Sequence, residues 1–112
     1  MLRLNSDGTL DSSFGSGGKE VVTMGSGGVS VSEMTLDSSG NITLVGAADG
    51  NVAIARFTSS GSLDTNFDGN GKLTLDFGGT DWATGAALDA NGKLVITGTS
   101  QGSSYSIILA RV

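Results

Sequence analysis

Apolar residues occur along this chain in short runs, and each run is flanked by Gly, Asn, Asp or Ser. Short apolar runs between turn-forming residues are typical of strands in all-β proteins. No segment combines a helical apolar period with helix-capping residues. The pattern therefore predicts eight strands in two sets of four, at Lys19–Met24, Val31–Leu36, Asn41–Gly46 and Val52–Thr58, then at Lys72–Phe77, Thr84–Leu88, Lys93–Thr99 and Tyr105–Val112.

The turns and faces of these strands can also be predicted. Ser38–Asn41 and Ala90–Lys93 each contain Gly, which tolerates the positive φ of a tight hairpin turn. The segment Val52–Ala55 carries valine and isoleucine on one face and alanine on the other. A sheet with one solvent-exposed face would alternate apolar and polar residues along each strand instead. We therefore expect a sheet packed between two neighbours, as in a propeller blade.

The chain repeats itself. NSDGTLDSSFGSGGK at residues 5–19 returns as TSSGSLDTNFDGNGK at residues 58–72, with 7 of 15 positions identical. Leu36–Gly46 returns as Leu88–Gly98, an offset of 52. A fixed period in this range indicates a stacked array or a propeller, in which one unit cannot bury its own apolar faces.

The repeat suggests how the chain is divided. Leu2-Arg3-Leu4 resembles the last strand of each unit, because Arg3, Arg56 and Arg111 align. The segments between units repeat a leucine, an aspartate and a phenylalanine, so we interpret them as ordered connectors. The predicted division is a surplus strand and connector at 1–18, a first blade at 19–58, a connector at 59–71 and a second blade at 72–112.

Composition narrows the possible functions. The 112 residues form about two repeats, whereas arrays generally need about three for stability. We therefore expect the chain to associate with copies of itself or to belong to a longer protein. The net charge of −5 without clustered basic residues argues against a nucleic-acid partner. The start MLRLNSDG does not resemble a signal peptide, and no apolar run approaches the roughly 18 residues of a membrane helix.

Cysteine and histidine are absent, which removes disulfides, thiol nucleophiles, Cys/His zinc sites and histidine triads. A glycosidase would need two carboxylates flanking a cleft. Most aspartates lie in turn-like contexts, and the two glutamates are unmatched. We therefore predict no enzyme activity and no catalytic, cofactor or metal site.

Three features allow two interpretations each. Asp64–Gly69 matches the opening of a calcium loop, but Leu75 stands where a bidentate glutamate is expected, so a connector turn is favoured. The repeated arginines recur with Asp11 and Asp64, which favours structural pairs over ligand recognition.

The third feature is the non-repeated pair Asp81-Trp82. The indole could stack on a sugar ring while the carboxylate accepts hydroxyl protons. Packing in the core or between blades is favoured, because tryptophan is highly buried on average. Tyr105 allows the same two interpretations.

The order Arg-[Leu/Phe]-x-x-x-Gly-[Ser/Thr]-Leu-Asp-x-x-Phe, followed by Gly-Lys, occurs within Leu2–Lys19 and again within Ala55–Lys72. Together with Leu36–Ile42 and Leu88–Leu94, it resembles the bacterial delta-sixty repeat family. The family usually has Asn-Pro-Asp-Gly where this chain has Asn-Ser-Asp-Gly and Thr-Ser-Ser-Gly. The resemblance implies a β-propeller in long, often exported bacterial proteins without an assigned activity.

The sequence thus predicts an all-β fold with two four-stranded β-propeller blades per chain. The ring would be completed by homo-oligomerisation, as a trimer or tetramer, or by further repeats of a longer propeller. The expected function is a non-catalytic, self-assembling scaffold, with a carbohydrate-binding propeller and a glycan partner as the alternative. The expected location of the parent protein is extracellular or on the cell surface.

Overall fold

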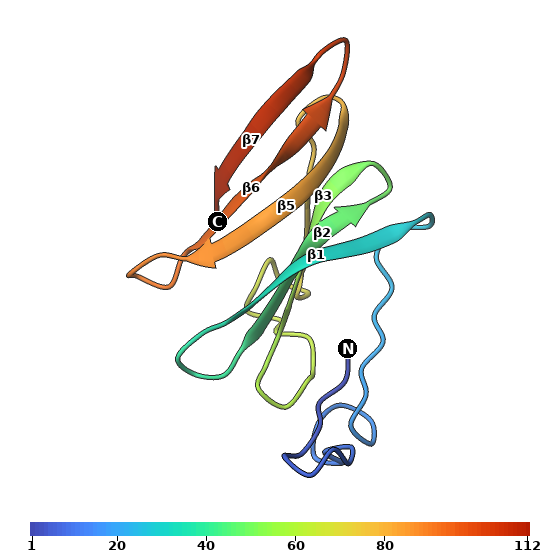
Figure 1. Ribbon diagram of the computed structural model, residues 1–112, viewed down its shortest axis with the longest axis vertical. Helices are drawn as coiled ribbons and strands as arrows, with labels where there is room; N and C mark the ends of the chain where they lie inside the picture. Colours follow the sequence, from blue (N-terminus) through green and yellow to red (C-terminus); the bar gives the residue numbers. More distant parts are fainter.

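The computed structural model describes residues 1–112 and contains two antiparallel sheets without helices (Figure 1). No helix long and apolar enough to cross a membrane is therefore present. The first sheet contains, in hydrogen-bonded order, β1 (Val29–Leu36), β2 (Ile42–Ala48), β3 (Asn51–Phe57) and β4 (Lys72–Leu75). The second contains β5 (Thr80–Leu88), β6 (Leu94–Gln101) and β7 (Tyr105–Arg111). The predicted all-β fold is confirmed.

The two predicted hairpin turns are present and are built alike. Asp37 accepts the backbone N–H of Asn41 at 2.9 Å, and Asp89 accepts that of Lys93 at 2.9 Å. Each turn contains a glycine with a φ near +80°, a conformation that other residues avoid. An aspartate before each turn thus holds the chain while the glycine reverses its direction.

A bulge recurs in the first strand of both sheets. The register of β1 against β2 shifts between Val31 and Glu33, and that of β5 against β6 shifts between Ala83 and Gly85. Opposite these bulges lie Gly46 and Gly98, where an added Cβ would collide with the carbonyls of Ser30 and Trp82 respectively. The two sheets are therefore copies of one structural unit, down to the irregularity in a strand.

One predicted strand is absent, and another belongs to a different sheet. Lys19–Met24 was expected to open the first sheet, but Lys19 makes only isolated bridges, to Leu2 and Ser16. Lys72–Phe77 was expected to open the second sheet. Instead β4 pairs with β3 and closes the first sheet, which leaves the second with three strands. A periodic sequence defines the length of a unit but not where the unit begins, so the strands were grouped wrongly.

The central strands of the first sheet, β2 and β3, are buried on both faces, as the apolar pattern of Val52–Ala55 predicted, whereas β1 is largely exposed. One face packs against the second sheet, through residues that include Val52, Ile54 and Ile96, all fully buried. The other face packs against the N-terminal segment, which we define as residues 1–24, through residues that include Phe14 and Phe57. Figure 1 shows the first sheet between this segment and β5–β7.

The N-terminal segment is a shortened copy of the half-unit formed by β3, the connector and β4. Leu2 pairs with Lys19 as Ala55 pairs with Lys72. The N–H of Arg3 donates to the carbonyl of Gly18 at 3.0 Å, and the N–H of Arg56 donates to that of Gly71 at 2.8 Å. The segment therefore occupies the place of a preceding unit from which the other strands are missing.

Replacing Gly98 with alanine tests the close approach at the bulge. The new methyl group would collide with the Trp82 carbonyl. Forcing extra volume into a packed site generally destabilises a protein by about 1–3 kcal/mol, so we expect a loss of that size in the free energy of unfolding, measured by urea denaturation. Gly102→Ala is the control, because nothing lies near its Cβ position. Equal effects of both substitutions would contradict the explanation.

Candidate functional site

At each connector, an arginine, an aspartate and a phenylalanine contact one another. In the first, the Arg3 Nε donates to Asp11 Oδ2 at 2.8 Å, and its guanidinium lies over the Phe14 ring at 4.6 Å. In the second, the Arg56 Nε donates to Asp64 Oδ2 at 2.8 Å, and its guanidinium lies 5.7 Å from the Phe67 ring centre. We call each arginine, aspartate and phenylalanine set a connector clamp. The predicted Arg–Asp pairs are therefore present in both repeats.

The second oxygen of each clamp aspartate organises the turn that follows. Asp11 Oδ1 accepts the Ser13 hydroxyl at 2.6 Å and the Ser13 N–H at 3.0 Å. These two hydrogen bonds are the largest causes that lower the pKa of Asp11, and Arg3 adds to them. Asp64 Oδ1 accepts the Asn66 N–H at 3.0 Å. The carboxylates thus connect strand end and turn, which supports the structural interpretation of the pairs.

The segment Asp64–Gly69, considered as a calcium loop, is part of this second clamp. Asp64 is buried, and both of its carboxylate oxygens accept hydrogen bonds from the protein. Asp68 and Gly69 both have positive φ, as residues of a tight turn do. No group of three or more His, Cys, Asp or Glu side chains is placed to hold a metal ion. The geometry supports the connector-turn interpretation.

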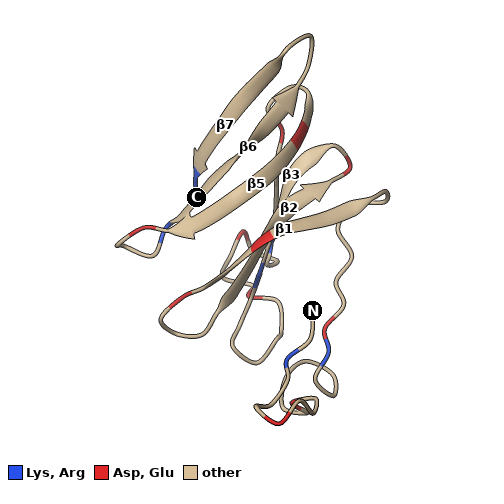
Figure 2. Cartoon of the chain, in the orientation of Figure 1, with Lys and Arg blue, Asp and Glu red and all other residues tan.

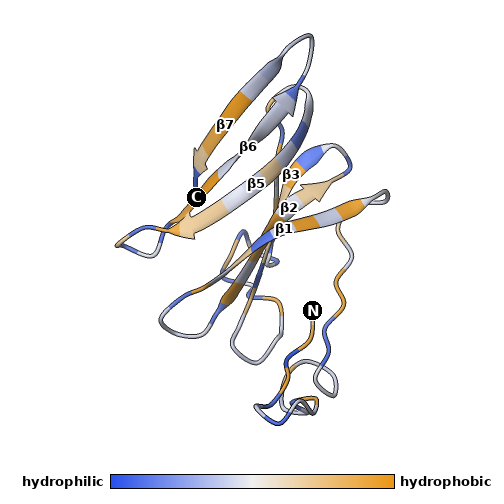
Figure 3. Cartoon of the chain, in the orientation of Figure 1, coloured by the Kyte–Doolittle hydropathy of each residue, from blue (hydrophilic) through white to orange (hydrophobic).

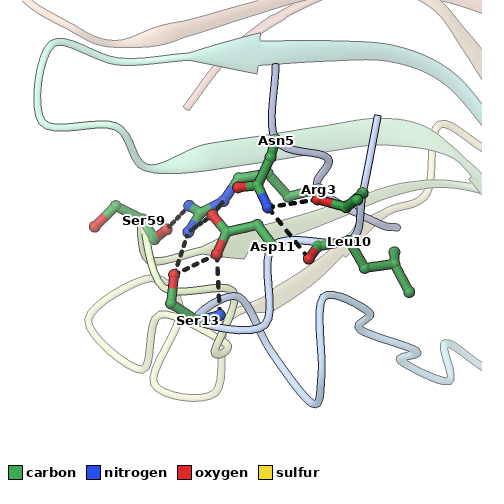
Figure 4. A network of polar contacts seen from close by, with 7 residues as sticks. Arg3, Asn5, Leu10, Asp11, Ser13 and Ser59 are labelled. Atoms are coloured by element: carbon green, nitrogen blue, oxygen red, sulfur yellow. Dashed lines mark hydrogen bonds and ion pairs between the residues drawn. The ribbon is translucent and has the colours of Figure 1, made fainter. Parts of the chain in front are cut away.

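The first clamp also contacts the next repeat (Figure 4). The Arg3 Nη1 donates to the carbonyl of Ser59 at 2.7 Å, and the N–H of Gly15 donates to the carbonyl of Ser60 at 2.7 Å. The side chain of Arg56, the equivalent of Arg3, donates to Asp64 alone. The first connector is thus docked on the second through Arg3, whereas Arg56 of the second clamp makes no such contact with a further connector. The sequence did not reveal this contact, because its acceptors are backbone carbonyls.

Asp81 and Trp82 do not form a joint sugar site. Successive side chains of a strand point to opposite faces. Asp81 is fully buried on the inner face of the second sheet, where its Oδ2 accepts the Phe77 N–H at 2.7 Å. Trp82 lies on the outer face, across from Thr99. The geometry therefore speaks against the alternative in which these two neighbours act on one sugar ring, and the burial of Asp81 supports the favoured packing interpretation for that residue.

The outer face of the second sheet is apolar and uncovered. Trp82, Thr99 and Ile107 form one row across its three strands, and Ile107 is 92% exposed. Leu109 and Tyr105 lie on the same face, 71% and 69% exposed. Figure 3 shows apolar residues along β7, and Figure 2 shows that most charged residues lie instead in turns and connectors. Such apolar patches mark interaction sites.

A second apolar surface lies at the opposite end of the molecule. A cavity of about 200 Å³ opens between the N-terminal segment and the first sheet. Eleven of its fourteen lining residues are hydrophobic. They include Met1, Val22, Val31, Leu44 and Ala53. The molecule thus has an uncovered apolar face at one end of its stack of layers and an open apolar cavity at the other.

The sequence matches one family model, a domain of unknown function (DUF5122) described as a β-propeller, over residues 1–14 and 37–67. The matched residues contain both connector clamps and the hairpin of β2 and β3. The match supports a β-propeller repeat family of unknown function. Neither the search of curated proteins nor that of solved structures returned a match.

The turn aspartates predict how stability depends on pH. The Asn41 side chain is the largest cause that lowers the pKa of Asp37, and the Lys93 N–H is the largest cause that lowers the pKa of Asp89. A lowered pKa in the folded state means that these groups contribute stability above the ordinary value of 3.8 and lose it as pH falls through the folded value.

We therefore expect the thermal midpoint to fall as pH decreases below 3.8, measured by circular dichroism. An Asp37→Asn, Asp89→Asn double variant keeps acceptor oxygens that do not titrate, so its midpoint should fall less over the same range. Identical pH profiles for the two proteins would show that the turn carboxylates are not responsible.

Proposed function

We propose that the chain is a structural, non-catalytic repeat module that assembles with copies of itself into a β-propeller. One observation carries the proposal: residues at equivalent repeat positions are buried between the two sheets but exposed at the two ends. Val52 is fully buried, and its equivalent Ile107 is 92% exposed. Ala83 is fully buried, and its equivalent Val31 is 60% exposed.

These pairs support the proposal that the two end surfaces are halves of one interface. Within the chain, Val52 of the first sheet and Ala83 of the second belong to the same buried cluster. On the outer face of the second sheet, Ile107 stands at the repeat position of Val52. In the wall of the cavity, Val31 stands at the repeat position of Ala83. Burying a side chain of this kind contributes roughly 1.5–3 kcal/mol, which favours association of the two surfaces.

The two surfaces differ, so the contact runs head to tail. Head-to-tail contacts between identical copies generate a ring when the rotation closes. Each copy contributes two repeats, and propellers typically contain about 4–8 blades. Three or four copies would then give six or eight blades. In a longer parent protein, which we propose is exported, adjacent repeats would make the same contact.

The mass of the purified chain in solution tests the proposal. Light scattering after size exclusion should give three or four times the chain mass of 11.1 kDa. Ile107→Asp places a charge on the outer face and should shift the mass toward that of one chain. Ser103→Asp, in the exposed turn between β6 and β7, is the control and should leave the mass unchanged. A stable monomer for the unmodified chain at all concentrations would refute self-assembly.

A carbohydrate-binding role is the alternative proposal. It is favoured by the position of Trp82 and Tyr105 on the same outer face, where two aromatic rings could stack on sugars. Under this alternative, a glycan array should show binding that Trp82→Ala reduces at least tenfold. An array without any binding would refute it.

A further inference from the structure

We infer that Val21 and Val22 of one copy add to the second sheet of another copy at the place of its missing fourth strand. They would run antiparallel to β7, with Val22 opposite Ile107 and Val21 opposite Ile108. The inference rests on the proposed self-association and names the residues that make it.

The pairing follows from the repeat. Lys19–Val22 corresponds to β4, Lys72–Leu75, at an offset of 53, and β7 corresponds to β3 at an offset of 55. In the first sheet, Val52 lies opposite Leu75 and Ala53 lies opposite Thr74. Moving both strands by their offsets places Ile107 opposite Val22 and Ile108 opposite Val21.

Both edges are open in the single chain. β7 pairs only with β6, so its outer edge has no neighbour. The backbone of Val21 and Val22 makes no backbone hydrogen bond within the chain, and Val21 is 89% exposed. Unpaired strand edges are templates for pairing with another chain. In each copy, the second sheet lacks a fourth strand beside β7, and the backbone of Val21 and Val22 has no strand to pair with.

The same pairing fills the cavity. Val22 lines it, and cross-strand partners point to the same face, so Ile107 of the second copy would enter beside Val22. Within the chain, Val52 belongs to one buried cluster with Ala83 and Ile96. Val31, the equivalent of Ala83, and Leu44, the equivalent of Ile96, also line the cavity. The cavity is therefore lined by the equivalents of the residues that surround Val52, and Ile107 is the equivalent of Val52.

An overlap limits the length of the new pairing. Leu109–Val112 and Met1–Leu4 correspond to the same repeat positions, so only one of them can lie beside Lys19 and Glu20. Met1 already exchanges two hydrogen bonds with Glu20, both 2.9 Å long, and Arg3 is fixed in its clamp. An intramolecular segment has the higher effective concentration. Met1–Leu4 therefore stays, and the second copy pairs through Ile107 and Ile108.

The register can be tested by disulfide formation, because the chain has no cysteine of its own. Val22→Cys and Ile107→Cys proteins are mixed, allowed to exchange and mildly oxidised. The expected product on a non-reducing gel is a covalent dimer that neither protein forms alone, since directly opposed strand residues lie within disulfide distance. Val21→Cys with Ile107→Cys is the matched negative control, because these side chains would point to opposite faces.

A Val52→Cys, Leu75→Cys double variant is the positive control. It occupies the same repeat positions within one chain and should form an intramolecular disulfide. If Val22→Cys does not fold, Val21→Cys mixed with Ile108→Cys tests the same register. A discrete oligomer in which neither pair cross-links would overturn the pairing and leave self-assembly standing. A monomer by light scattering, without cross-links, would overturn both.

Discussion

Both faces of β2 and β3 are apolar and buried, and the rest of the structure follows from the need to cover them. The second sheet lies on one face, and the N-terminal segment lies on the other. A sheet that presents apolar residues in both directions has no side suited to water. A sheet that covers one face of its neighbour has a second apolar face of its own that must also be covered. Such layers therefore continue in one direction unless they close into a ring. The exposed outer face of the second sheet is where this sequence of layers stops.

The connector clamp fixes the path of the chain from one strand of a sheet to the next. Twelve residues separate Thr58 from Gly71, and the Arg56–Asp64 pair folds them back so that β4 can lie beside β3. The N-terminal segment keeps the same fold with little of its sheet present, since its clamp and its backbone hydrogen bonds repeat those of the second connector. The connector is therefore specified by local interactions, whereas the sheets depend on their neighbours.

Much of this arrangement could be predicted from the sequence, for identifiable reasons. Hairpin turns, the doubly buried β3 and the Arg–Asp pairs all follow from local patterns or from repetition. The assignment of β4 to the first sheet could not be predicted, because a repeat gives the length of a unit but not the residue at which the unit begins. A joint sugar site at Asp81 and Trp82 was kept as an alternative, although alternation along a strand places the two side chains on opposite faces. The docking of one connector on the next uses main-chain oxygens, which any residue supplies.

That last contact has a consequence for how such chains vary. Arg3 and Gly15 bind the carbonyls of Ser59 and Ser60, so the receiving turn contributes only backbone atoms. The corresponding turns of the two repeats differ in side chain at Asp7 and Ser60. A unit can therefore be duplicated, deleted or exchanged at this junction while most of its side chains diverge, as long as the receiving turn keeps Gly61, where an added Cβ would meet Gly15 and Phe14.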